Sequence, residues 1–190
     1  RDRKNTITIS KKEPLKVLKS IMEKYKILEN DLPFVGGALG YISYDINTNS
    51  SKKNLIPRMQ FGIYDWSIII DHHKQIAFIV TTQFIEDSSL FIKSLSKKFN
   101  KKGTSKKDFS IKGEILENTN KRKYKAKFEV VKNYLQMGDC YQVNLSKKYE
   151  VETLGDPWIF YSKFRQINKS PFMAYLNFDG TVLLSGSPER

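Results

Sequence analysis

Residues 174–190 read AYLNFDGTVLLSGSPER, and this stretch decides the fold class. Two apolar runs flank Asp179-Gly180, a dipeptide typical of the two-residue turn of a β-hairpin. The second run leads into Ser187-Pro188-Glu189-Arg190, which places a carboxylate where a predicted strand ends. Such a carboxylate is either a solvated turn residue or an active-site group. Burial would raise the pKa of Glu189 and suit it to general acid–base chemistry.

Two helices are predicted upstream of this hairpin. Asp156-Pro157 caps and opens the nearer one, which carries Trp158, Tyr161 and Phe164. The other runs from an Asn120 N-cap to Gly138 at its C-terminal end. Its predicted inner face is formed by Tyr124, Phe128, Val131 and Leu135. Between these helices, residues 141–151 (YQVNLSKKYEV) indicate a strand.

The polar side of that predicted strand leaves two interpretations open. Gln142, Asn144 and Ser146 share one face of the strand, and Tyr141, Val143 and Leu145 share the other. The polar face either meets water or lines a pocket, and periodicity alone does not choose between them. Cys140 has no neighbouring cation in the sequence that would activate a thiol, so we do not assign it a nucleophilic role.

The N-terminal half adds one helix and several strands. A helix is predicted over 13–27 and a glycine-rich strand over 36–45. Residues 61–71 and 75–82 predict an antiparallel hairpin joined by His72-His73-Lys74. A short helix is predicted over 86–98, and the lysine-rich stretch 97–114 reads as a solvated connection.

This order of elements favours an α+β fold with large antiparallel sheets and segregated helices. The predicted domains are 1–108 and 109–190. Two local motifs are discounted as sites. Adjacent strand residues point to opposite faces, so His72 and His73 would not converge on a metal. The glycines of GGALG (36–40) precede a strand and not a helix, and are assigned to tight backbone packing.

Charge and cysteine content narrow the functional classes. Lys plus Arg total 33 against 20 Asp plus Glu, a formal net charge of +13. The lysines are spread over every segment, so we predict no nucleic acid partner. No apolar run approaches the roughly 20 residues of a membrane span, so we predict no membrane partner either. The single thiol fits a reducing compartment, and a cytoplasmic location is expected. A non-catalytic basic binding module remains the alternative, and its binding would weaken steeply with salt.

Four segments together resemble the chorismate-utilising enzymes, and among them the aminodeoxychorismate synthase component I branch. They are DLPFVGGALGYISYD (31–45), FGIYDWSIIIDH (61–72), MGDCYQVNLS (137–146) and SPFMAYLNFDGTVLLSGSPER (170–190). Asn144 and Arg190 favour this branch. NKSPFM (168–173) is similar to a stretch of anthranilate synthases, so anthranilate synthase component I remains an alternative.

The resemblance implies amination of chorismate with glutamine-derived ammonia, for para-aminobenzoate and folate synthesis. A glutamine amidotransferase subunit or fused domain would supply the ammonia, and Mg²⁺ would bind the substrate carboxylates. The glutamate of the family's S-P-E motif faces chorismate, and that catalytic role carries over to Glu189. The family's Mg²⁺ ligands, its catalytic histidine and the lysine of P-I-K-G-T are expected beyond Arg190. We therefore predict that the chain is an N-terminal fragment without metal ligands and is inactive alone.

The resemblance also points to an effector pocket. Pro171, Phe172 and Met173 match a segment that lines a tryptophan pocket in relatives. The other half of that pocket comes from an L-L-E-S-like motif, which this sequence lacks.

Overall fold

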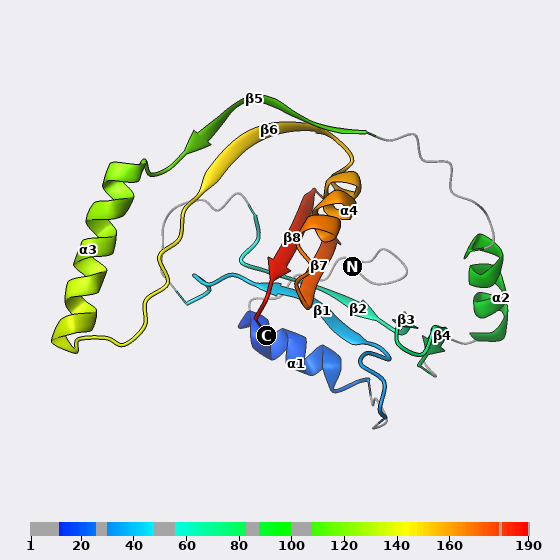
Figure 1. The fold of residues 1–190 in the computed structure, drawn as a ribbon. Helices are drawn as coiled ribbons and strands as arrows, with labels where there is room; N and C mark the ends of the chain where they lie inside the picture. Colours follow the sequence, from blue (N-terminus) through cyan, green and yellow to red (C-terminus); the bar gives the residue numbers. More distant parts are fainter. Residues whose placement is uncertain are drawn as a thin grey trace. The chain divides into compact units, whose positions relative to one another are not determined.

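The computed structural model describes residues 12–25, 30–47, 56–82, 88–99, 108–178 and 180–189, which form helices and antiparallel strands (Figure 1). The predicted α+β class is confirmed. The chain divides into two compact units, Arg1–Gly103 and Thr104–Arg190. The predicted boundary lay a few residues later, and the functional assignment of the two domains stays a prediction.

The first unit contains α1 (Pro14–Met22), β1 (Gly37–Ile42), β2 (Met59–Tyr64), β3 (Trp66–Asp71), β4 (Ile76–Thr81) and α2 (Ser88–Phe99). The second contains β5 (Phe109–Glu117), α3 (Lys121–Met137), β6 (Tyr149–Gly155), α4 (Pro157–Ile167), β7 (Phe172–Phe178) and β8 (Thr181–Ser187). The described strands pair as β1–β2, β3–β4, β5–β6 and β7–β8, all antiparallel.

In the first unit, the predicted strand 61–71 is wrong as one element, because the chain changes partner at Asp65. Tyr64 pairs with Gly37 of β1, whereas Trp66 pairs with Thr81 of β4. The Asp65 carbonyl accepts hydrogen bonds from both the backbone N–H and the side-chain hydroxyl of Thr82, at 2.8 and 2.9 Å. These two hydrogen bonds fix the point at which the β1–β2 hairpin ends and the β3–β4 hairpin begins. The hairpin of β3 and β4 itself is confirmed.

The glycine prediction holds for β1. Gly36 has φ 156° and Gly37 has φ 126°. A Cβ at Gly40 would overlap the backbone of Phe61 on the paired strand. Glycine is required here because the strands approach closely and the backbone lies outside the ordinary β region.

Helix α1 is shorter than the predicted 13–27. The Glu13 carboxylate accepts from the backbone N–H groups of Leu15 and Lys16, which starts the helix at Pro14. The helix ends at Met22, whose carbonyl accepts from the Tyr25 N–H in a following turn. Tyr25, which falls within the predicted range, therefore lies beyond the helix.

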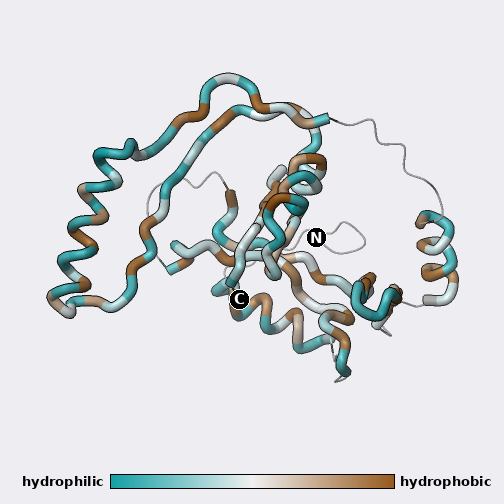
Figure 2. Tube along the Cα trace, viewed as in Figure 1, coloured by the Kyte–Doolittle hydropathy of each residue, from teal (hydrophilic) through white to brown (hydrophobic). Residues whose placement is uncertain are grey.

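Apolar burial is sparse in both units. Among the described residues, Leu95 of α2 and Tyr161 of α4 are the buried apolar side chains. In the first unit, the Trp66 ring meets the Phe91 ring edge-on, with centroids 5.4 Å apart, which anchors α2 to β3. Apolar residues recur along the other elements (Figure 2), where most large ones stay partly or largely exposed.

Regular structure occupies both ends of the lysine-rich stretch 97–114. Residues 97–114 were interpreted as one solvated connection, but α2 extends to Phe99 and β5 starts at Phe109; residues 100–107 lie outside the described chain. In β5, Phe109 pairs with Gly155 and Ile111 with Thr153. Pairing with β6 gives these residues a regular strand structure, which the lysine-rich composition of the stretch did not predict.

The predicted strand 141–151 is also wrong in its bounds. Strand β6 starts at Tyr149, opposite Glu117, the last residue of β5. Beyond Asn118, which still bonds to Lys148, the chain turns into α3, so β5 offers no backbone partner to residues 141–147. The alternating pattern of that stretch is real, but no described strand lies beside it.

Helix α4 is the packing centre of the second unit. Its Phe160 ring lies 5.1 Å from Phe109 of β5, measured between centroids. Its Trp158 and Tyr161 rings lie 5.0 and 5.4 Å from Tyr175 of β7. Two aromatic faces therefore hold α4 between the β5–β6 ribbon and the β7–β8 hairpin.

Candidate functional site

Glu189 lies two residues beyond β8, at the end of the hairpin that α4 supports. The Ser187 hydroxyl oxygen accepts from the Glu189 backbone N–H at 3.1 Å, and the same hydroxyl donates to the Glu189 carbonyl at 2.9 Å. These bonds form a tight turn around Pro188. Glu189 is exposed among the described residues, so its immediate surroundings are those of a solvated turn, and its catalytic role stays a prediction.

Asn168 ties the C-terminal end of α4 to β8. Its backbone N–H donates to the Phe164 carbonyl at 2.8 Å, and its side-chain amide donates to the Gly186 carbonyl at 3.0 Å. Its side-chain oxygen accepts from the Ser170 hydroxyl at 2.6 Å. A Cβ at Gly186 would lie against the Phe164 ring. The strand preceding Glu189 is thus fixed from one side, a role that the sequence analysis did not assign to Asn168.

A hollow of about 630 Å³ opens beside α4 and β7. Its lining residues are Trp158, Tyr161, Arg165, Lys169, Ser170, Pro171, Met173 and Tyr175. Three aromatic rings and two cations in one hollow suit a planar molecule that carries a carboxylate. The Arg165 guanidinium lies 5.8 Å from the centroid of the Tyr161 ring, within reach of a cation–π contact.

The structure brings two of the three predicted effector residues to this hollow. Pro171 and Met173 line it, whereas Phe172 does not and is 44% exposed. Met173 and Phe172 are neighbours on β7, where successive side chains point to opposite faces. Glu189 is not among the lining residues. The predicted general acid–base therefore does not share this hollow with Pro171 and Met173.

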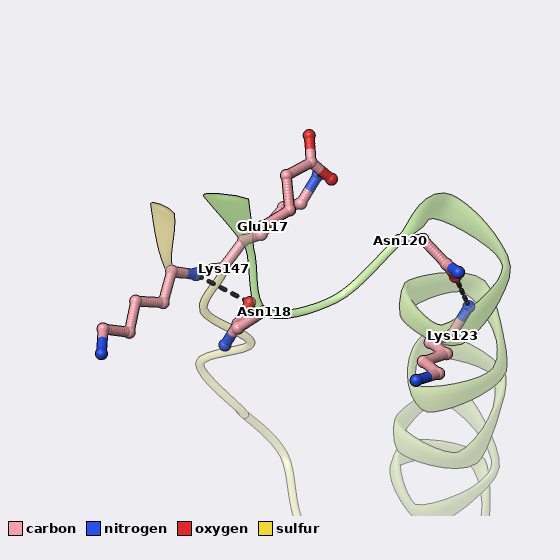
Figure 3. A network of polar contacts seen from close by, with 6 residues as sticks. Glu117, Asn118, Asn120, Lys123 and Lys147 are labelled. Carbon is pink, nitrogen blue, oxygen red and sulfur yellow. Dashed lines mark hydrogen bonds and ion pairs between the residues drawn. The ribbon is translucent and has the colours of Figure 1, made fainter. Parts of the chain in front are cut away.

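A polar network closes the β5–β6 ribbon next to α3 (Figure 3). Asn118 and Lys148 exchange two hydrogen bonds: the Asn118 N–H donates to the Lys148 carbonyl, and the Lys148 N–H donates to the Asn118 side chain. Lys147 Nζ lies 2.8 Å from a Glu117 carboxylate oxygen and 4.8 Å from the centroid of the Tyr149 ring. The hydrogen bond to Glu117 is the main cause that raises the pKa of Lys147 above its ordinary value of 10.5.

The stretch GDCYQVNLS supplies no formed site. Tyr141 is 97% exposed, and Gln142, Asn144 and Ser146 are exposed as well. Neither of its two predicted faces is covered, so the choice between water and a pocket stays open. Cys140 is a half-buried free thiol.

Among the residues that the structure describes, the remaining titratable side chains do not form a metal centre. His72 and His73 lie exposed in the turn between β3 and β4, where the His73 N–H donates to the Asp71 carboxylate at 2.9 Å. Throughout the described part of the chain, no three His, Cys, Asp or Glu residues cluster where they could hold a metal ion. In that same part, no helix has the length and apolar character needed to cross a membrane.

Known proteins match the chain along nearly its whole length. Aminodeoxychorismate synthase component 1 of Escherichia coli is 31% identical over 193 residues, which cover 96% of this chain and 41% of that protein. The chloroplastic anthranilate synthase alpha subunit 1 of Arabidopsis thaliana is 27% identical, covering 93% of this chain and 36% of its own length. The chain thus spans about two fifths of the curated relatives it matches.

The fold has a solved counterpart. The crystal structure of anthranilate synthase component I from Streptococcus pneumoniae matches with a TM-score of 0.72 at 21% identity, over 96% of this chain and 45% of that one. This likeness confirms the predicted anthranilate synthase-like fold. Residues 2–190 match the model of the chorismate binding enzymes, and the chain belongs to that family.

Proposed function

We propose that this chain is part of an enzyme that aminates chorismate to 4-amino-4-deoxychorismate, for para-aminobenzoate and folate synthesis. The observation that carries the proposal is the 31% identity to aminodeoxychorismate synthase component 1 over 96% of the chain. The residues of GDCYQVNLS and SPER, with Asn144 in the first motif, support the same branch. A cytoplasmic location belongs to this proposal.

In the proposed reaction, Glu189 is the general acid–base. Ammonia forms a C–N bond to the chorismate ring, the C–O bond to the ring hydroxyl breaks, and the hydroxyl leaves as water with a proton from the Glu189 carboxyl. The carboxylate then regains a proton from the ammonium group of the product. Protonation matters because hydroxide is a poor leaving group, and such transfer contributes about 10²–10⁴-fold to a rate.

The metal and the nitrogen donor are assigned outside the described residues. No acidic cluster in them fits Mg²⁺, so no step of this chain runs through the metal. If bound by the whole enzyme, Mg²⁺ would neutralise substrate carboxylates. The relatives' name, component 1, supports a second component, which we propose to be a glutamine amidotransferase that releases ammonia.

Product analysis tests the proposal. The protein made from the complete coding sequence is supplied with chorismate, ammonium and Mg²⁺. The products are separated by chromatography and identified by mass spectrometry. Aminodeoxychorismate retains the enolpyruvyl group, whereas anthranilate forms with release of pyruvate. Pyruvate formed in equal amount with the product would overturn the assignment and favour anthranilate synthase. The stretch 168–173, which is similar to a stretch of anthranilate synthases, supports that alternative.

A matched pair of variants tests the role of Glu189 in the same protein. Glu189→Gln removes the transferable proton and keeps the shape of the side chain, so kcat is expected to fall about 10²–10⁴-fold. Glu152→Gln alters an exposed carboxylate on β6 and is expected to leave kcat unchanged. Equal kcat values for the two variants would remove Glu189 from the mechanism.

The hollow beside α4 is proposed as part of an aromatic amino-acid effector site. Pro171 and Met173 would contact the ring of the effector, and Arg165 its carboxylate; Phe172 would act from outside the hollow. Calorimetric titration with tryptophan is the test. Arg165→Gln is expected to weaken binding at least tenfold relative to an Arg122→Gln control, and absence of heat with the unaltered protein would contradict the site.

A further inference from the structure

Helix α3 carries apolar residues on two separate sides. At 100° per residue, the two sets lie about 120° apart around the helix axis. The first stripe is Tyr124, Phe128, Val131 and Leu135, and the second stripe is Val130, Tyr134 and Met137. A surface helix of a globular protein needs one apolar stripe to face its core, and a helix that is apolar on more sides is normally covered on more sides.

Both stripes stay largely open in the described part of the second unit, although Tyr124 and Val131 are half-buried. Phe128 and Leu135 of the first stripe are 50% and 41% exposed, and Tyr134 and Met137 of the second are 51% and 78% exposed. Helix α4 packs on β5, β7 and β8, whereas α3 has no contact of that extent with any described element and no buried residue. Polar and apolar residues alternate along its length (Figure 2).

The ends of α3 are nevertheless fully specified. The Asn120 side chain accepts from the Lys123 N–H at 3.0 Å and caps the first turn (Figure 3). Gly138 at φ 80° closes the last turn, where its N–H donates to the Leu135 carbonyl. Capped ends and exposed apolar stripes together indicate a helix whose two apolar sides require further packing partners.

Charge on α3 selects between possible covers. The helix carries six cations, Lys121, Arg122, Lys123, Lys125, Lys127 and Lys132, against one acid, Glu129. Three of the cations occupy the first turn, where the helix dipole already presents positive charge. A second copy of the chain on either stripe would bring these like charges together. An acidic margin around an apolar surface would instead neutralise them.

We propose that α3 is a two-sided docking helix for polypeptide that presents apolar surfaces edged with Asp and Glu. Its source is the part of the chorismate binding enzymes that this chain does not span, since the matched region is 41% of the first relative and 45% of the solved structure. The inference rests on family membership alone. It holds whichever product the enzyme makes, so the product assay and the test below fail independently.

Hydrogen exchange on two proteins tests the proposal. The first is the 190-residue chain, and the second is a chimera in which this chain replaces the residues it matches in the Escherichia coli relative. Amides of α3 are expected to exchange at least about 100-fold more slowly in the chimera, while amides of the β3–β4 hairpin serve as the internal reference. The free chain is expected to show the same fast α3 exchange at every protein concentration.

Variants separate the two stripes. In the chimera, Phe128→Ser on the first stripe and Tyr134→Ser on the second are each expected to restore fast exchange of α3. Gln136→Ser, at an exposed position on the polar side of the helix away from both stripes, is the control and is expected to leave exchange slow. Reversal of charge by Lys125→Glu is expected to speed exchange in the chimera and to have no such effect in the free chain.

Each other outcome overturns the proposal. Slow α3 exchange in the free chain that depends on concentration would show that a second copy is the cover, and slow exchange independent of concentration would show cover from within the chain. Fast α3 exchange in both proteins, with the β3–β4 amides equally protected in both, would show that the remaining polypeptide does not dock on α3. Protection lost by only one serine variant would reduce the helix to one docking side.

Discussion

Replacement of Tyr161 by Ala is expected to unfold the second unit at much lower denaturant concentration. Tyr161 is 5% exposed, and its ring lies 5.6 Å from Trp158 and 5.4 Å from Tyr175. It is the one buried apolar side chain among the described residues of this unit. Its removal therefore takes away contacts that no other described side chain replaces.

The expected loss follows from burial and ring contacts. Truncation of a buried aromatic residue to Ala costs about 3–5 kcal/mol in a packed core. The two ring pairs account for about 1–3 kcal/mol of this, at about 0.5–1.5 kcal/mol each. We take about 3 kcal/mol, because Trp158 is 46% exposed and the cluster lies at the surface. With a slope of about 1–2 kcal/mol per M urea, the midpoint falls by roughly 1.5–3 M.

Tryptophan fluorescence isolates the effect. The chain has two tryptophans, Trp66 in the first unit and Trp158 in the second. In a Trp66→Phe background, emission during urea unfolding reports on Trp158 alone, 5.6 Å from the altered ring. Tyr134→Ala is the matched control, since it makes the same truncation at a side chain that is 51% exposed.

The comparison between the two variants decides the matter. Tyr134→Ala is expected to shift the midpoint by less than about 0.5 M, as is usual for an exposed position. Equal shifts for Tyr161→Ala and Tyr134→Ala would refute the reasoning, because the described packing around α4 would then contribute nothing specific. An unchanged midpoint for Tyr161→Ala would do the same.

Three further outcomes follow from the polar contacts and turns of the second unit. Asn168→Ala removes the side-chain bond to the β8 backbone and is expected to cost about 1–2 kcal/mol in urea unfolding, whereas Asn177→Ala, at an exposed position of β7, should cost little. The raised pKa of Lys147 means that its contribution to stability is complete below pH 10.5 and is lost as the pH rises through the folded-state value. Urea midpoints measured from pH 9 to 12 are expected to fall more steeply for the unaltered chain than for Glu117→Gln, and parallel curves would contradict this. Gly138→Ala places a Cβ at φ 80° with no atom within 4 Å to clash, so backbone strain alone is expected to cost about 1 kcal/mol and to speed amide exchange in the last turn of α3.

Local signals in the sequence were sufficient for the helix ends and for one turn. Asn120, Gly138 and Asp156 act where they were predicted, because a cap is satisfied by backbone groups within four residues of it. Gly180 has φ 78° in the predicted hairpin turn, although its neighbour Asp179 lies outside the described residues. These features depend on neighbours in sequence, so sequence alone carries the information.

Which strand pairs with which could not be predicted from such local signals. The handover at Asp65 depends on a bond to Thr82, seventeen positions away. The start of β6 at Tyr149 depends on where β5 ends, and the tie between Asn168 and β8 joins a helix end to a strand that follows a hairpin. In each of these places the deciding contact lies outside the window over which periodicity is measured.

The candidate site shows the same division between local and distant contributions. Its strand β8 is positioned within this chain, by β7, by the Asn168 bond and by the aromatic packing of α4. The turn at Ser187 then fixes the Glu189 backbone. Cover over the Glu189 side chain is a different requirement, because a glutamate becomes a useful proton donor near neutral pH through burial.

Helices α3 and α4 present this contrast within one unit. Both are capped by a side chain at the first turn, yet α4 is packed on two aromatic faces and α3 on neither of its stripes. The packed elements α4, β7 and β8 lead to Glu189, whereas the largely exposed helix α3 is the proposed docking helix. Polypeptide that docks on α3 would therefore complete the unit without moving the strand that positions Glu189. Placement of Glu189 and docking on α3 would then be separate requirements, so a variant that loses docking is expected to keep the Asn168 and Ser187 bonds that position Glu189.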